Sequence, residues 1–278
     1  MKKIIINADD FGHSKENNEA IKAGFQAGII TATSLMANMD GFENAVKEIL
    51  PQIPHIDTGF HFNIMEGKSL TKSELLCDSN GYFNNSYQNL IIKSKQKEFL
   101  KQTEKEFRVQ IEKVLNYTQI SHVDSHVHTH AIPEIFKLIL KLAEEYNIKY
   151  IRTQQENPYI VLNKIFNTKF PINIVKNVLL NYFSIINKRA MNNSQVKTND
   201  YFIGVLYTGY MDESAILNGL RKIGKENTVT EIIFHPYLPQ DIRFTGKSHN
   251  YREYLITQNP NFKETLKNSD FVLTNYKN

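Results

Sequence analysis

Short apolar runs of strand length alternate with helical patterns along most of the chain. Residues 3–8 (KIIINA) form a nearly continuous β-branched run, which is typical of a strand buried on both faces. In the segment that follows, Ser14 is suited to an N-cap, apolar residues recur at helical spacing, and Gly28 is suited to a stop. Further strand-like runs lie at residues 29–37, 56–64, 148–153, 201–209, 230–236 and 270–276.

Amphipathic helices are predicted between these runs. Residues 41–50 form a short helical pattern, and the charged segment from Lys93 to Tyr117 has an apolar stripe at helical spacing. A third helix is expected to begin at Pro133, since proline is favoured at the first helical position. The alternation predicts an α/β fold with a parallel sheet, open or closed into a barrel. The chain has no internal repeat and no linker rich in proline or serine, so we expect one domain over residues 1–278.

One segment, residues 157–199, departs from this rhythm. It contains no acidic residue, has apolar clusters, and carries six cations: Lys164, Lys169, Lys176, Lys188, Arg189 and Lys197. We expect a helical insertion that packs on the domain, beside the mouth of the site, or on a second subunit in a homodimer. A membrane-surface helix or a site for an anionic ligand is the alternative.

Composition narrows the class of protein. With 41% hydrophobic and 22% charged residues, the chain has the make-up of a soluble globular protein. A net charge of +4 over 278 residues gives no reason to expect nucleic acid as a partner. Cys77 is the single cysteine, so a metal site would need histidine and carboxylate ligands. The apolar run near the start is too short for a signal peptide or a membrane span, and we expect a cytoplasmic protein without a membrane partner.

The nine residues 122–130, HVDSHVHTH, raise the question of chemistry. A histidine or aspartate occupies every second position, and these side chains would share one face of an extended chain. We therefore interpret the run as a strand that carries ligands rather than a solvated turn. His122 is expected deep in the sheet, and His130 past the strand end, before Pro133.

Other unusual polar residues fall near the ends of predicted strands. Ligands bind at the carboxyl ends of parallel strands, so these side chains should gather in one place; they are Asp9, Asp10, His61, Asp124, His126, Arg152 and His235. Adjacent carboxylates such as Asp9 and Asp10 repel each other unless a cation lies nearby. The alternatives are a charged turn that caps the next helix and, for His61, a core histidine.

Such a group of residues suits hydrolysis. One carboxylate and two imidazoles leave coordination positions open on a divalent metal. A second carboxylate can then act as general base, and a histidine from another strand can protonate the leaving group.

Long stretches of the chain resemble a known family. The motifs NADDFGHSKENNEAI, TGFHFNIMEG, HVDSHVHTHAIPEIF and TEIIFHP, together with most of the C-terminal segment, are similar to those of the YdjC/ChbG family of carbohydrate deacetylases. The resemblance implies an irregular (β/α) TIM-like barrel of the polysaccharide deacetylase type. It also implies removal of acetyl groups from N-acetylated sugars such as chitooligosaccharides.

The resemblance also implies roles for individual residues. The metal ligands would be Asp10, His61 and His126, the catalytic base Asp9, and the acid or oxyanion partner His235. Substrate-facing residues would be His128, Arg152 and Asp124, with Asp124 alternatively orienting an imidazole. Val127 and Thr129 depart from the common family pattern of the histidine run.

The cofactor would be one divalent ion. Two imidazoles favour zinc by ligand softness, whereas the family is usually described with magnesium. Two other functions stay open from the residues alone: a metal-dependent phosphoesterase on a related barrel, and a barrel that binds sugars without turnover.

Overall fold

A computed structural model describes residues 1–239 and 248–277 of the chain. Its strands are β1 (Lys2–Phe11), β2 (Ala32–Leu35), β3 (Asp57–Phe62), β4 (His122–Ser125), β5 (Tyr150–Ile151), β6 (Tyr201–Ile203), β7 (Val229–Phe234) and β8 (Phe271–Thr274). They form one sheet in the order β5-β4-β3-β2-β1-β7-β6, with β8 paired to the start of β1. Every pair of neighbouring strands is parallel, as predicted.

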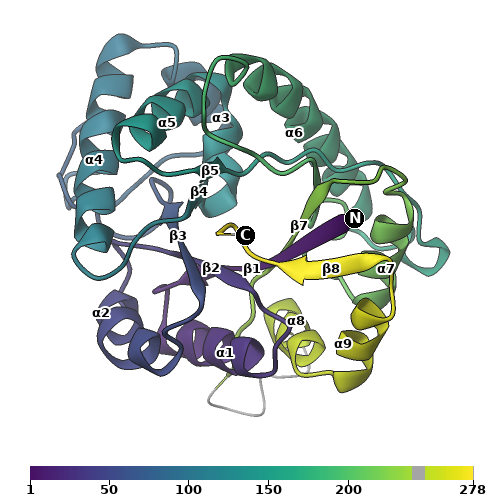
Figure 1. Cartoon of the computed structure of the whole chain (residues 1–278). Coiled ribbons are helices and arrows are strands. Elements are labelled where there is room, and N and C mark those ends of the chain that lie inside the picture. The colour runs from purple at the N-terminus through teal and green to yellow at the C-terminus, as the bar shows by residue number, and fades with distance from the viewer. Residues whose placement is uncertain (240–247, 278) are drawn as a thin grey trace.

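Helices surround the sheet in a ring (Figure 1). They are α1 (Lys15–Gln26), α2 (Phe42–Asn44), α3 (Tyr87–Lys93), α4 (Lys97–Leu115), α5 (Pro133–Glu145), α6 (Phe170–Ala190), α7 (Glu213–Arg221), α8 (His249–Thr257) and α9 (Pro260–Lys267). Two predicted helix starts are confirmed. The Ser14 side chain caps α1 by accepting a hydrogen bond from the N–H of Asn17, and Pro133 is the first residue of α5. The helix predicted from residue 93 to 117 is α4, which begins at Lys97 and ends at Leu115, and Lys93 itself is the last residue of the separate helix α3.

The strand β1 illustrates how the sheet is built. Ile4, Ile6 and Ala8 belong to the main hydrophobic core of the protein. Burial of each isoleucine contributes about 1.5–3 kcal/mol. Because side chains alternate along a strand, Asn7 and Asp9 lie on the opposite, concave face, where polar groups meet. The sheet thus separates an apolar outer layer under the helices from a polar interior.

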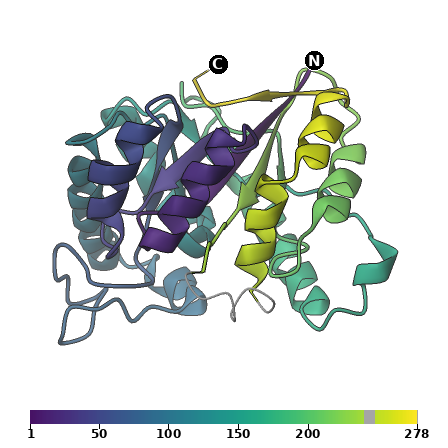
Figure 2. The ribbon, with the colours of Figure 1, turned by 90° about the horizontal axis from the view of Figure 1, so that it is seen from below.

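The sheet curls until its two edges approach each other. Near β5, Ile151 N–H donates to the carbonyl of Lys197 at 3.0 Å, and Phe202 N–H of β6 donates to the carbonyl of Gln155 at 2.8 Å. The architecture is therefore a parallel α/β half-barrel. Figure 2 shows both termini at one end of the strands, whereas the chain that leads into α6 lies near the other end, where the strands finish.

The interior of the half-barrel is closely packed, and Gly59 shows why one position requires glycine. A Cβ atom at Gly59 would collide with the imidazole ring of His122 on the neighbouring strand. His122 is fully buried, is stacked on Tyr276, and lies within 3.1 Å of the Asn7 side chain. Its predicted place deep in the sheet is confirmed.

The insertion over residues 157–199 is helical, as predicted. It contains a 3-10 turn (Leu162–Lys164) and the 21-residue helix α6. The insertion packs on the domain, where the Asn187 side chain donates to the carbonyl of Ala131 at 2.8 Å. Within residues 1–239 and 248–277, no helix is both long enough and apolar enough to cross a bilayer.

Candidate metal centre and active site

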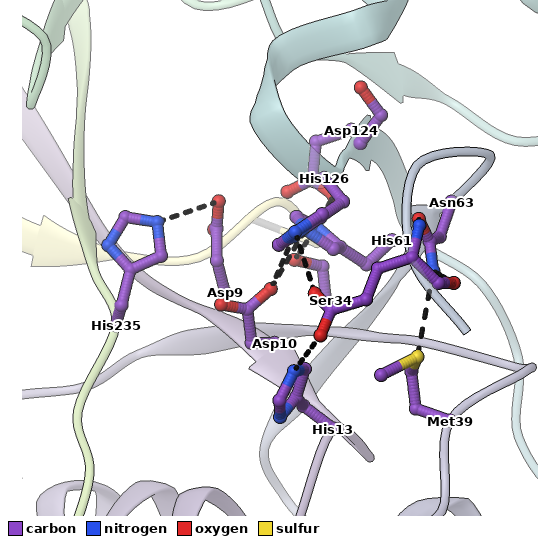
Figure 3. A network of polar contacts seen from close by, with 12 residues as sticks. Asp9, Asp10, His13, Ser34, Met39, His61, Asn63, Asp124, His126 and His235 are labelled. Atoms are coloured by element: carbon purple, nitrogen blue, oxygen red, sulfur yellow. Dashed lines mark hydrogen bonds and ion pairs between the residues drawn. The ribbon is translucent and has the colours of Figure 1, made fainter. Parts of the chain in front are cut away.

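A cavity of about 660 Å³ opens at the carboxyl ends of the strands. The polar side chains that line it include Asp9, Asp10, His61, His126, His128 and His235. They come from the ends of β1, β3, β4 and β7, which lie far apart in the sequence but belong to one run of the sheet, β4-β3-β2-β1-β7, and the side chains point toward one another (Figure 3). Because the strands are parallel, their carboxyl ends lie at the same edge of the sheet, and the predicted residues gather there.

The end of β1 turns both adjacent aspartates toward this cavity. On a regular strand, Asp9 and Asp10 would point to opposite faces. The pairing register with β2 shifts between Ala8 and Phe11, and Asp10 adopts a left-handed backbone with φ of 67°. This conformation is costly for a residue with a Cβ, although aspartate tolerates it better than most. The distortion is what allows two neighbouring carboxylates to share one site.

Asp10, His61 and His126 form the group best suited to hold a cation. Their potential ligand atoms lie within 4.8 Å of one another. Asp10 Oδ1 is 3.3 Å from His61 Nε2 and 3.0 Å from His126 Nδ1. Two imidazole nitrogens and one carboxylate oxygen are a donor set that suits zinc and similar ions. The residues present thus fit a divalent metal, in agreement with the predicted ligand set.

Burial and charge act in opposite directions on the ionisation of this group. Burial alone would raise the pKa of Asp10, but hydrogen bonds from His126 and His61 hold it well below its usual value. Burial alone would lower the pKa of His61, but the charge of Asp124 and the hydrogen bond to Asp10 raise it to about 10. Without a cation, the protons on the imidazoles supply the positive charge that the carboxylates require.

Asp124 lies behind His61 rather than in the cavity. His61 and Asp124 are direct neighbours in the β3–β4 register, and His61 Nδ1 is 2.6 Å from Asp124 Oδ1. A carboxylate on one ring nitrogen fixes the orientation of the imidazole and leaves the other nitrogen for a metal. Asp124 is fully buried, so direct contact with a sugar is excluded and the prediction that it orients an imidazole is the one that fits.

Arg152 is also placed differently from our expectation. It follows the end of β5, as predicted, but its side chain is completely buried and does not line the cavity. The guanidinium binds both oxygens of Asp9 at 2.7 Å and an oxygen each of Asp124 and Glu231 at 2.6 Å. The prediction that Arg152 contacts the substrate is wrong, because three carboxylates behind the cavity take up its donors.

This ion-pair cluster sets the charge of Asp9. Burial would raise the pKa of Asp9, but the charge and hydrogen bonds of Arg152, aided by His61 and His235, lower it well below its ordinary value. Asp9 is therefore a carboxylate at neutral pH. Asp9, His61 and Asp124 form a second group with suitable spacing for a metal. We disfavour it, because the Arg152 guanidinium already occupies both carboxylates and would repel a cation.

His235 flanks Asp9 from β7. Its Nε2 atom is 3.9 Å from Asp9 Oδ2, and its Nδ1 atom is 3.5 Å from Glu253 Oε2 in α8. The backbone N–H of His235 also donates to Glu253, at 2.6 Å. Burial would lower the pKa of His235, but the hydrogen bond and charge of Glu253 raise it to about 9. The ring is thus protonated at neutral pH and has a proton to donate.

The histidine run is a strand only in its first four residues. After Ser125, the chain enters a 3-10 turn (His126–Ala131) in which Val127 and His128 have left-handed φ values of 53° and 55°. The Ser125 hydroxyl accepts a hydrogen bond from the N–H of His130 at 2.8 Å, and this local bond closes the turn. Our interpretation of the run as a strand is therefore wrong for His126 and His128, which lie in this turn.

The turn gives the histidines of the run different surroundings. His126 and His128 line the cavity, whereas His130 is buried between Ser125 and Gln154 and lies past the strand, as predicted. Burial and the nearby Arg152 lower the pKa of His128 to about 3, so its ring is neutral. Among the described residues its Nδ1 atom is buried without a hydrogen-bond partner.

Sequence reasoning did not identify three acidic residues that contact the residues of the site. Glu66 Oε2 is 3.4 Å from His126 Nε2, and Glu253 and Glu231 hold His235 and Arg152 as described above. The sequence could have indicated a role for Glu231, because a single acidic residue within the apolar run TEIIF requires a buried partner for its charge. Glu66 and Glu253 lie in a loop and a helix whose patterns give no such signal.

The fold and the site define a parallel α/β half-barrel with a histidine–carboxylate centre at the carboxyl ends of its strands. The chain belongs to the YdjC-like protein family, whose model matches residues 3–268. This confirms the resemblance seen in the motifs.

Several curated relatives are named carbohydrate deacetylase. A protein of Brevibacillus brevis named carbohydrate deacetylase is 36% identical over 147 residues, which cover 52% of this chain and 57% of the relative. A Clostridium beijerinckii protein of that name is 32% identical over 56% of this chain and 63% of the relative. The chain therefore spans between 57% and 63% of the length of these two relatives. A Thermoanaerobacter pseudethanolicus carbohydrate deacetylase is 25% identical over 99% of this chain and 98% of its own length.

One solved structure matches nearly the whole fold. It is a protein of Enterococcus faecalis V583 proposed to cleave cellobiose phosphate, with a TM-score of 0.74, 22% identity and coverage of 99% and 98% of the two chains. At this identity, the likeness concerns the fold.

Proposed function

We propose that this protein is a metal-dependent carbohydrate deacetylase that removes acetyl groups from N-acetylated mono- or oligosaccharides. The observation that carries the proposal is the meeting of Asp10, His61 and His126 beside Asp9 and His235 in one cavity. The names of the relatives of the family support it. We further propose that residues 1–278 form one domain of the irregular (β/α) barrel type found in polysaccharide deacetylases.

In this proposal Asp10, His61 and His126 hold one divalent ion. Bound there, the ion would supply positive charge to polarise the acetamide carbonyl and to acidify a water molecule. The two imidazoles favour zinc over magnesium, because imidazole is a softer ligand than a carboxylate or water oxygen. Asp124 supports the proposal, since it holds His61 with Nε2 directed at Asp10.

The remaining residues perform the proton transfers. Asp9 is a carboxylate at neutral pH, so it accepts the proton of the attacking water. His235 is protonated and donates to the amine nitrogen as the amide bond breaks. Arg152 keeps Asp9 in place by two hydrogen bonds of 2.7 Å and does not touch the substrate. Acetate and the free amino sugar are the products.

The test measures metal content and product together. Purified protein is stripped with a chelator, reloaded with zinc or magnesium, and assayed for acetate release from a panel of N-acetylated sugars and for phosphate release from sugar phosphates. We expect acetate release that depends on metal. His61→Ala and His126→Ala should each abolish bound metal and acetate release while the circular dichroism spectrum is kept. Phosphate release without acetate release, or full metal occupancy in either variant, would contradict the proposal.

A further inference from the structure

The helix α6 buries more polar than apolar side chains against the protein and leaves most of its large apolar side chains exposed. Its buried positions are Asn173, Asn177, Ser184 and Asn187, together with the apolar Leu180 and Phe183. In contrast, Ile174, Val175 and Val178 are exposed, as are other large apolar residues of the same helix. A surface helix ordinarily shows the reverse pattern, with its apolar stripe toward the core. The exposed apolar side of α6 therefore indicates a surface that binds a partner.

Hydrogen bonds fix this orientation. The Asn173 side chain donates to the carbonyls of Leu206 and Thr208 at 3.2 and 3.1 Å. The Asn177 side chain donates to Glu156 Oε2 at 3.1 Å, and this buried carboxylate also accepts the N–H groups of residues 204–206. If the helix rolled to bury its apolar side, these polar groups would lose their partners inside the protein. The outward face is therefore a stable property of the fold.

The exposed apolar side chains of this region form what we call the apolar ridge. Half of the large apolar residues that are exposed in the described structure lie within residues 160–185, although this segment is less than a tenth of the chain. The ridge consists of Ile160, Leu162, Phe166, Ile172, Ile174, Val175, Val178, Tyr182 and Ile185. Phe166 is 88% exposed and Leu162 is 78% exposed. Exposed apolar residues gathered in this way mark an interaction surface.

The positive charge near the apolar ridge indicates which kind of partner it binds. Residues 157–199 contain no acid, and cations interrupt or follow the ridge along the chain. In the described part of the structure, no carboxylate forms an ion pair with Lys169, Lys176 or Arg189. A twofold contact between two copies of this surface would bring like charges together, which disfavours a dimer through the ridge. Apolar side chains with lysine and arginine around them are typical of helices that lie in the interface of anionic membranes.

We propose that the apolar ridge and its cations dock this protein on the surface of an anionic phospholipid bilayer. The sequence led us to expect no membrane partner, with a membrane-surface helix in residues 157–199 as an alternative, and the orientation of α6 is what favours that alternative. Ile172, Val175 and Lys176 also line the cavity, so docking places the mouth of the site against the lipid surface. Figure 2 shows the segment that begins the insertion projecting from the body of the molecule.

The experiment is co-sedimentation of the full chain with vesicles. One set is pure phosphatidylcholine and the other contains phosphatidylcholine with phosphatidylglycerol. The test variant is Phe166→Ser/Ile174→Ser/Val178→Ser, which changes three ridge residues outside the cavity lining. The control is Val272→Ser, because Val272 is exposed on β8, which pairs with the start of β1 at the other end of the half-barrel.

We expect the natural chain and Val272→Ser to bind the phosphatidylglycerol vesicles, and the triple variant to fall to the level measured with pure phosphatidylcholine. Lys169→Gln/Arg189→Gln and added salt should weaken binding in the same direction. Thermal melts establish that each variant is folded. The proposal is overturned if the natural chain binds neither vesicle, if the triple variant binds as the natural chain does, or if light scattering shows a dimer that only the triple variant loses. None of these readouts depends on deacetylation, so this proposal and the proposed function can fail separately.

Discussion

At the scale of single residues, two neighbouring aspartates have different surroundings. Asp9 is held by Arg152, whereas Asp10 faces the imidazoles of His61 and His126. The sequence shows only that the two carboxylates are adjacent. The left-handed backbone at Asp10 allows both carboxylates to face the cavity with different neighbours, which fits the roles of metal ligand for Asp10 and base for Asp9 that we propose.

Substitution of each aspartate by asparagine separates these roles. Asp9→Asn should keep the metal and lose nearly all turnover, because an amide does not accept the proton of water. Asp10→Asn should weaken metal binding by at least about tenfold, since a charged ligand becomes neutral. Metal titration by calorimetry and an acetate assay measure the two effects. Equal metal affinity in both variants would show that the roles are misassigned.

The contact between Glu253 and His235 predicts a change in pH dependence. His235 is a base whose pKa is raised to about 9, so its protonated form, and the stability gained from the ion pair, are lost as pH rises through that value. An acid at this position should give an activity profile that falls on the alkaline side. Glu253→Gln removes the charge that raises the pKa of His235, so the alkaline limb should move to lower pH.

The control for this experiment is Glu264→Gln in α9, where the side chain is exposed. Its kcat profile should match that of the natural chain. A profile of Glu253→Gln that keeps its alkaline limb in place would exclude His235 as the titrating acid.

At the scale of elements, α6 inverts the usual relation between burial and polarity. Substitutions at two successive residues, Asn177 and Val178, are therefore expected to affect stability to very different extents. Asn177→Ala should destabilise the fold by about 1–3 kcal/mol, because the buried Glu156 carboxylate loses a donor. Val178→Ala should change stability by less than about 0.5 kcal/mol, because Val178 is 63% exposed.

Urea denaturation of the two variants measures this difference. A larger loss in Val178→Ala than in Asn177→Ala would mean that the apolar side of α6 packs on protein in solution.

At the scale of the whole molecule, Arg152 joins three strands of the half-barrel. Its partners Asp9, Asp124 and Glu231 come from β1, β4 and β7. Arg152→Met would leave these carboxylates buried without a cation. We expect a loss of about 3–5 kcal/mol in the free energy of unfolding at neutral pH, by analogy with other broken buried ion pairs. Chemical denaturation checks the loss.

Protonation offers a second readout for the same variant. Without Arg152 the buried carboxylates should bind protons more readily than in the unfolded chain, so the stability of Arg152→Met should rise as pH falls toward their new pKa values. Stability that is unchanged from the natural chain at neutral pH would show that the cluster contributes little to the fold.

The pattern of the sequence determined the parallel α/β class, the start of α5 at Pro133 and the strand ends at which Asp9, Asp10, His61, His126 and His235 lie. These features follow from local rules, because burial on both faces of a strand and helical periodicity are properties of short segments. The family motifs implied that Asp10, His61 and His126 bind a metal, and the structure places these three residues close enough together to hold one.

Only the tertiary structure decided how the remaining side chains are used. Arg152 was predicted to face a substrate but is enclosed by carboxylates from three strands, and the histidine run leaves the strand after Ser125. Likewise, the side of α6 that meets the protein depends on Glu156 and the carbonyls after β6. Each outcome depends on partners distant in sequence, and the pairing of buried charges and donors is settled only when the chain brings those partners within hydrogen-bonding distance.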